Sequence, residues 1–188
     1  MATALARERI LDAAQRVISD LGAARLTLDV IAHAAGVSKG GLLYHFPTKE
    51  ALIGALADDY VVSLSRCVQQ AMDQHATDDA VSQELQAHIV GLLQGESRLR
   101  IKTLGAALIV AAANDINSLK VIREKLVEQN DRLAKSGARF PSAAVILLAV
   151  DGLIFREALQ MSPFAEAQRE QVVAELLVHA RNLPGAAM

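Results

Sequence analysis

Hydrophobic positions along the chain recur with the period of an α-helix. In the first segment Ile10, Ala14, Val17 and Ile18 follow one another at short helical spacings, and Gly22 stands where a left-handed terminal residue is favoured. No stretch alternates between apolar and polar residues, and the four prolines fall where the helical period breaks. The pattern predicts an all-α protein with about nine helices.

Helix-capping residues divide the N-terminal part of the chain into short helices. Thr27 is a suitable N-cap for the segment LDVIAHAA, which ends at Gly36. Ser38 caps the segment KGGLLYHF, Pro47 ends it, and Thr48 caps a longer amphipathic helix. We therefore predict a head of three short helices followed by a long fourth helix.

The rest of the chain predicts five further helices, which form a C-terminal bundle. Segment 143–160 is apolar nearly all round, which favours a helix covered on every side. Its most apolar run, 143–155, is interrupted by Asp151 and is too short for a membrane span. The charges of Asp151 and Arg156 need partners within the bundle or across a dimer interface. The expected helices lie at 81–92, 104–112, 119–133, 143–160 and 163–183, with a loop at 137–141.

Composition bounds the class of protein without deciding it. The 188 residues are 52% hydrophobic and 21% charged, which is typical of a folded chain. Cys67 is the single cysteine, and the N-terminus lacks the apolar core of a secretion signal, so we expect a cytoplasmic protein. The net charge is -2, but residues 1–50 hold six basic and five acidic residues, a weak bias towards a DNA-binding head.

No arrangement of residues indicates catalysis or metal binding. The motifs G-x-S-x-G and H-E-x-x-H and a phosphate-binding loop are all absent, so we expect a non-enzyme without a cofactor. His75, Asp78 and Asp79 lack a second histidine at ligand spacing, and a solvated loop is favoured over a metal site. Solvated charges are likewise favoured over an anion site for three cations of one segment: Arg98, Arg100 and Lys102.

Two short helices joined through Ala-Gly-Val at 35–37 have the spacing of a helix-turn-helix. In that motif the second helix lies in the major groove with its N-terminal residues towards the base edges. Gly40 and Gly41 each cost a helix about 1 kcal/mol relative to alanine. Glycine at these positions allows the backbone N–H groups and the positive end of the helix dipole to approach phosphate closely.

The stretch TLDVIAHAAGVSKGGLLYHFPTKEAL, residues 27–52, resembles the TetR (tetracycline-repressor) family of transcriptional regulators. The shared pattern is a threonine-capped helix, an A-x-x-A-G-V-S turn, a recognition helix ending in Y-H-F, and P-x-K-x-x-L. The match covers the first quarter to third of the chain, and the remainder agrees in length and helicity. The resemblance implies a DNA-binding domain at 1–48 and a ligand-binding and dimerisation domain at 49–188.

The resemblance also implies which residues contact DNA. Many relatives have a hydroxyl or alanine residue where Gly41 stands and an aromatic residue where Leu43 stands, so few polar side chains remain for reading bases. Lys39 is therefore expected to be the main base-reading residue, with hydrogen bonds to guanine. The implied DNA contacts are Thr27, Ser38, Lys39, Gly40, Gly41, Tyr44, His45 and Lys49.

The function that the resemblance implies is a ligand-responsive repressor acting as a homodimer on a palindromic, double-stranded operator. Two recognition helices about 34 to 36 Å apart enter successive major grooves, and a ligand bound among helices four to eight tilts the fourth. We expect the last two helices to form the dimer interface, with Ala149, Gly152 and Leu176 in it. Since only 3% of residues are aromatic, an aliphatic effector is favoured, contacting Met72, Leu104, Leu108 and Ile109.

A second hypothesis belongs to a different class of protein. A helical small-molecule carrier or interaction protein with a non-functional helix-turn-helix also accounts for the nearly neutral charge and the recognition helix with few polar side chains. Salt dependence separates the two, because operator binding weakens steeply with salt and binding by a carrier does not.

Overall fold

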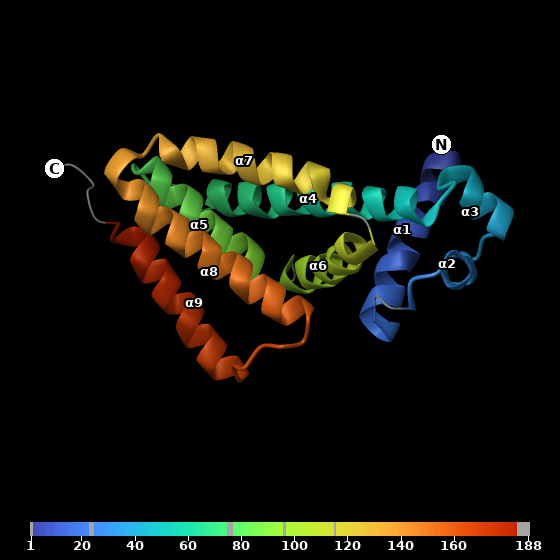
Figure 1. Cartoon of the computed structure of the whole chain (residues 1–188). Helices are drawn as coiled ribbons and strands as arrows, with labels where there is room; N and C mark the ends of the chain where they lie inside the picture. Colours follow the sequence, from blue (N-terminus) through green and yellow to red (C-terminus); the bar gives the residue numbers. More distant parts are fainter. Residues whose placement is uncertain (1, 23–24, 75–76, 96, 115, 184–188) are drawn as a thin grey trace. The chain divides into compact units, whose positions relative to one another are not determined.

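The computed structural model describes residues 2–22, 25–74, 77–95, 97–114 and 116–183, and this part of the chain is all-α (Figure 1). It contains nine α-helices and no strand, which confirms the predicted fold class. Short 3₁₀ segments lie at Ile116–Leu119 and Gly137–Arg139. The helices are α1 Ala2–Leu21, α2 Leu28–Ala35, α3 Lys39–His45, α4 Lys49–Gln74, α5 Ala80–Leu93, α6 Ser97–Asn114, α7 Lys120–Ala134, α8 Phe140–Ala158 and α9 Glu166–Arg181.

The chain divides into two compact units, which we call the head unit and the bundle unit. The head unit comprises Met1–Tyr60 and Thr103–Ile122, and the bundle unit comprises Val61–Lys102 and Arg123–Met188. Helices α4, α6 and α7 contribute residues to both units. These units describe compactness and not function, so the division at residues 48 and 49 into DNA-binding and ligand-binding domains stays a prediction.

The head unit is built around α1, which packs against α2. Arg9 on α1 donates a hydrogen bond of 2.7 Å from Nη2 to the carbonyl oxygen of Ala35, the last residue of α2. Phe46 is buried, and the Arg7 guanidinium lies 5.4 Å from the centre of its ring. Fully buried side chains of this core include Ile10, Leu26, Ile31, Leu42, Leu52 and Leu56.

The bundle unit is organised by α5, which packs against both α8 and α9. Leu85, Ile89 and Leu93 on α5 are fully buried. A Cβ added at Gly91 would lie 2.6 Å from the carbonyl oxygen of Cys67, so α4 and α5 approach closely within this unit. A side chain at position 91 would force the two backbones apart.

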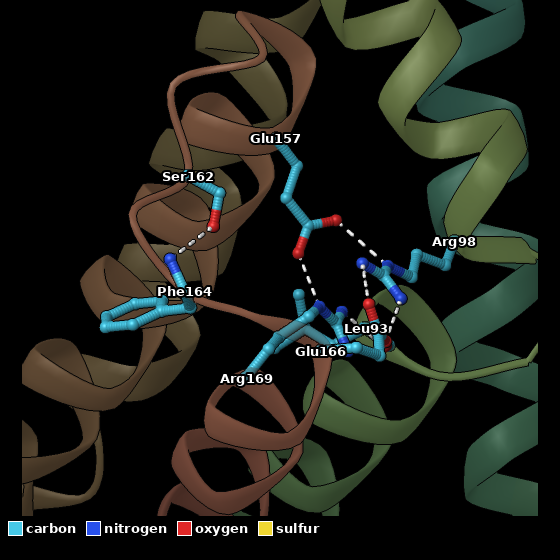
Figure 2. A network of polar contacts seen from close by, with 7 residues as sticks. All are labelled: Leu93, Arg98, Glu157, Ser162, Phe164, Glu166 and Arg169. Carbon is cyan, nitrogen blue, oxygen red and sulfur yellow. Dashed lines mark hydrogen bonds and ion pairs between the residues drawn. The ribbon is translucent and has the colours of Figure 1, made fainter.

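Four helices of the bundle unit meet in an ionic network in which Glu157 and Arg169 are buried (Figure 2). Glu157 of α8 accepts hydrogen bonds from Arg169 Nε of α9 at 2.5 Å and from Arg98 Nε of α6 at 3.0 Å. Arg169 also donates to the carbonyl oxygen of Leu93 at 2.6 Å, and Arg98 reaches Glu166 at 2.6 Å. The preference for a solvated Arg98 is therefore wrong, because two carboxylates offset the repulsion between this cation and the N-terminus of α6.

Helix α8 is not covered on every side within the single chain, contrary to the prediction from its apolar sequence. Ile146 and Val150 are buried, whereas Val145, Leu148 and Phe155 have exposed fractions of 66%, 69% and 54%. Asp151 and Arg156 are also exposed. The packing of α5 and α9 covers one face of α8 and leaves the other open.

Local boundaries differ from the prediction at two places. Helix α9 begins at Glu166 and not at Pro163, because the side chain of Gln168 accepts the Ala165 N–H at 3.0 Å. Residues 137–141 are not a loop, since they form a 3₁₀ turn that leads into α8, with Pro141 in its first turn.

Asp79, which we expected in a solvated loop, makes specific contacts within the bundle unit. Asp79 caps α5 by accepting the N–H groups of Val81 and Ser82, and it also pairs with Arg139. The hydrogen bond from Arg139 holds the pKa of the Asp79 carboxyl below its usual range. His75 lies outside the described residues. None of the described helices combines the length and the apolar character of a membrane span.

Candidate nucleic-acid interface

The turn between α2 and α3 has the left-handed conformation that its glycine favours. Gly36 has φ +63°, and its N–H bonds to the carbonyl oxygen of His33 at 3.1 Å. The Val37 N–H bonds back to Ala32 at 3.0 Å, and Arg9 holds the adjacent carbonyl of Ala35. The turn is therefore anchored to α1, which sets the angle at which α3 leaves it.

Three hydroxyl side chains cap the helices that begin in this region. Thr27 Oγ1 accepts the Val30 N–H at 3.3 Å, and Ser38 Oγ accepts the Gly41 N–H at 3.0 Å. Thr48 Oγ1 likewise accepts the Ala51 N–H at the start of α4, at 3.1 Å. A helix begins with four N–H groups that have no intrahelical partner, and each of these caps satisfies one of them. The others are suited to binding an anion such as phosphate.

The two glycines of α3 have different surroundings. A Cβ added at Gly41 would lie 3.2 Å from Ser38 Oγ, so a side chain there would crowd the cap of the helix. A Cβ added at Gly40 would meet no described atom within 4 Å. Contacts within the chain thus account in part for glycine at position 41 but not for glycine at position 40.

The side chains predicted to contact DNA are accessible in the head unit. Tyr44 has an exposed fraction of 76%, and its ring meets that of His45 edge to face at a centroid distance of 5.1 Å. Thr27, Ser38, Lys39 and Gly40 are exposed, and Gly41, His45 and Lys49 are half-buried. These residues come from the beginnings of α2, α3 and α4 and from the end of α3.

The sequence pattern did not indicate three residues of this region: Asp29, Arg9 and Arg7. Lys39 Nζ forms an ion pair with Asp29 of α2 at 2.9 Å, across ten positions of the sequence. Arg9 and Arg7 support the turn and Phe46 from α1, across 26 and 39 positions. Side-chain pairs can be predicted from sequence within one helix, where partners lie three or four residues apart. The three contacts described here join segments that are distant in sequence, so no such spacing indicates them.

The residues predicted for the effector and the dimer stay predictions. Leu104 and Leu108 are buried and Ile109 is half-buried in the head unit, while Met72 is half-buried in the bundle unit. An open pocket of about 410 Å³ in the bundle unit is lined by other residues, among them Leu93, Arg98, Arg169 and Leu177.

Ala149, Gly152 and Leu176, which are predicted for the dimer interface, are half-buried on α8 and α9. Among the described residues, no cluster of three or more His, Cys, Asp or Glu could hold a metal ion.

A capped pair of short helices with accessible N-termini, supported by a third helix, defines a helix-turn-helix protein of the DNA-binding class. Family models agree at both ends of the chain. The model described as bacterial regulatory proteins, tetR family, matches residues 10–56, and the tetracyclin repressor-like C-terminal domain matches residues 82–181. The chain belongs to the TetR family. It is a DNA-binding transcriptional regulator of that type and not an enzyme.

Individual relatives share this organisation over most of their length. The HTH-type transcriptional regulator BetI of Serratia proteamaculans (strain 568) is 24% identical over 172 residues, 86% of this chain and 85% of BetI. The solved structure of the multidrug binding protein EbrR with imidazole matches with a TM-score of 0.62 at 24% identity, covering 97% of each chain. The fatty acid degradation regulator FadR of Bacillus halodurans matches with a TM-score of 0.62 at 19% identity, covering 96% of this chain and 95% of the FadR chain. At these identities the two structural matches establish the fold alone.

Proposed function

We propose that this protein is a ligand-responsive repressor that binds a palindromic operator as a homodimer in the bacterial cytoplasm. A small apolar ligand releases it from the DNA. The observation that carries the proposal is the pair of capped N-termini of α2 and α3, with the exposed side chains of Lys39 and Tyr44 beside them.

In the proposed complex α3 lies in the major groove with its N-terminus towards the DNA. The absence of a side chain at Gly40 allows the backbone to approach a phosphate, and Lys39 donates a hydrogen bond to guanine. Tyr44 and His45 contact the backbone or bases, and Thr27 and Lys49 contact flanking phosphates. Phosphate contacts supply affinity, while Lys39 and the shape of the DNA supply selectivity.

The exposed face of α8 supports the homodimer. Val145, Leu148 and Phe155 present apolar surface to solvent in the single chain, and Gly152 on the same helix allows close approach of a second backbone. A second copy covering this face would remove that surface from water and give a symmetric contact. The dimer would then carry two recognition helices for two half-sites.

For the effector we propose an aliphatic compound. The low aromatic content leaves little surface for stacking, whereas Leu104, Leu108 and Ile109 supply aliphatic side chains within the head unit. Related folds have served different ligands, since EbrR has been solved with imidazole and with ethidium, and FadR is named for fatty acid degradation. Ligand binding releases DNA if the ligand has higher affinity for the conformation that does not fit the operator.

The experiment that tests DNA recognition is selection of the purified protein against a random duplex pool. A Lys39→Ala, Tyr44→Ala double variant is selected alongside, with Lys135→Ala as a control that removes an exposed lysine from the bundle unit. We expect a palindromic site for the wild type and the control. We expect the double variant to lose at least about tenfold in affinity, because a good base contact alone provides about 1 to 3 kcal/mol.

The salt dependence of binding separates this function from the carrier hypothesis. The affinity for the selected site should fall steeply with salt, with a slope close to the number of phosphates neutralised. If neither the wild type nor the control enriches any sequence at low salt, the repressor proposal fails. Salt-independent affinity for small molecules would then favour the carrier.

A further inference from the structure

The candidate interface contains an acidic residue in contact with the lysine expected to read bases. Lys39 Nζ lies 2.9 Å from Asp29 Oδ1 and 3.2 Å from Oδ2. Asp29 stands in the first turn of α2, and Lys39 is the first residue of α3. The two side chains have exposed fractions of 70% and 59%, so the pair lies in solvent beside both capped N-termini.

A carboxylate at this position opposes the main attraction between protein and DNA. Phosphate contacts by lysine and arginine supply most of the affinity for any duplex, and an aspartate beside them repels phosphate. The cap of α2 does not require Asp29, because Thr27 already accepts the Val30 N–H. The favourable interaction of Asp29 with the helix dipole is worth only a few tenths of a kcal/mol at an exposed site. The helix termini therefore do not account for the acid, and its contact with Lys39 needs another explanation.

The geometry of the ion pair leaves Lys39 able to donate one further hydrogen bond. An ammonium group has three N–H donors, and the contacts with the two carboxylate oxygens engage up to two of them. The remaining donor can meet a single acceptor, such as O6 or N7 of guanine, while the ion pair persists. A phosphate gains less from this lysine, because its positive charge is already shared with a carboxylate.

We propose that Asp29 is a positioning residue that sets the selectivity of Lys39. It holds the ammonium group at the start of the recognition helix and weakens its pairing with phosphate, so random duplex is bound less tightly than it would be without the acid. The operator loses less, because its guanine accepts the remaining donor. The inference rests on the proposed DNA-binding function and assigns to Asp29 the discrimination between operator and random duplex.

The test measures Asp29→Asn by fluorescence anisotropy on the selected operator and on a random duplex over a range of salt. We expect Asp29→Asn to bind random duplex about two- to fivefold more tightly, as loss of an exposed ion pair would allow. Its salt slope on random duplex should become steeper by about one, since one more phosphate is neutralised. The ratio of operator affinity to random-duplex affinity should fall.

Matched variants separate the effect of the position of Asp29 from the effect of removing one negative charge. Asp20→Asn removes the same charge from an exposed site at the end of α1 in the head unit and should leave the affinity ratio unchanged. Asp29→Glu retains the carboxylate and should restore most of the ratio. Lys39→Gln should weaken operator binding more than random-duplex binding, and in that background Asp29→Asn should behave like Asp20→Asn.

Two results would overturn the assignment. One is an Asp29→Asn variant that behaves like Asp20→Asn in the wild-type background, and the other is an equal gain on both duplexes. Failure of the underlying function is distinguishable, because the wild type would then show no salt-dependent binding to any selected duplex before a variant is examined.

Discussion

At the scale of single residues, His88 on α5 has both ring nitrogens engaged within the bundle unit. Nδ1 lies 2.8 Å from the carbonyl oxygen of Glu84, and because a carbonyl can only accept, Nδ1 carries the hydrogen. Nε2 lies 2.7 Å from Nε2 of Gln129 on α7 and accepts from that amide. The arrangement requires a neutral imidazole.

This arrangement predicts a pH dependence of stability. Burial lowers the pKa of His88, although Glu84 opposes the shift and Arg132 adds to it. The unfolded chain takes up a proton as the pH falls through about 6.5, whereas the folded chain resists it, so stability is lost below that pH. The thermal midpoint should fall between pH 7 and pH 5 by a few degrees more in the wild type than in His88→Gln.

The measurement is thermal unfolding followed by circular dichroism across that range. Carboxylates such as Asp79 are present in both proteins, so they change the thermal midpoint of both equally. The pKa of Asp79 is lowered in the folded chain, so its contribution to stability is lost only as the pH falls through about 4 and below. Parallel midpoints for the two proteins from pH 7 to pH 5 would show that His88 does not control the dependence.

At the scale of elements, α8 has two apolar faces with different surroundings. Its inner face, with Ile146, Val150 and Leu153, is buried in the bundle unit, and its outer face is exposed. A Cβ added at Gly152 would meet no described atom within 4 Å, so nothing in the described chain requires glycine there. Close approach of a second copy is the reason that we propose for this residue.

The proposed dimer predicts that Gly152→Leu yields monomers without unfolding the chain. Leucine is a better helix former than glycine by several tenths of a kcal/mol, and the site is open in the single chain, so the fold should persist. A leucine between two close helices should weaken association by at least about tenfold, since overpacking costs about 1 to 3 kcal/mol. Sedimentation velocity at micromolar concentration measures the change.

A matched control is Gly54→Leu on α4, where an added Cβ also meets no described atom within 4 Å. We expect it to remain dimeric. A Gly152→Leu protein that sediments as an intact dimer would place the interface elsewhere.

At the scale of the whole molecule, the proposed function couples a ligand site to operator binding. The coupling is reciprocal, so a ligand that weakens operator binding must itself bind less tightly to the operator complex, by the same factor. We expect an aliphatic acid or an acyl thioester to raise the thermal midpoint of the free protein and to lower operator affinity about 5- to 150-fold. Cationic dyes should do neither.

Thermal scans with both groups of compounds, followed by operator titrations with any compound that shifts the midpoint, test this coupling. If only the dyes shifted the thermal midpoint, the proposal of an aliphatic effector would be wrong. A shift without any change in operator affinity would contradict the coupling and leave DNA recognition intact.

The sequence alone determined the elements of the head and the class of protein. Thr27 and Ser38 cap α2 and α3 through hydrogen bonds that span three residues, and Gly22 and Gly36 terminate helices through their own positive φ angles. Such interactions depend only on near neighbours, so the spacing of residues predicts them. The helix-turn-helix and the family followed from this local pattern.

Only the tertiary structure decided which charges pair and which apolar faces stay open. Arg98 meets Glu157 across 59 positions of the sequence, and Lys39 meets Asp29 across two helices, so no local spacing predicts either pair. Helix α8 is apolar nearly all round, and a helix without a polar face carries no period that says which side turns inward. The face of α8 that stays exposed is the face that α5 and α9 do not cover. Contacts between distant segments depend on the arrangement of the helices and not on local sequence.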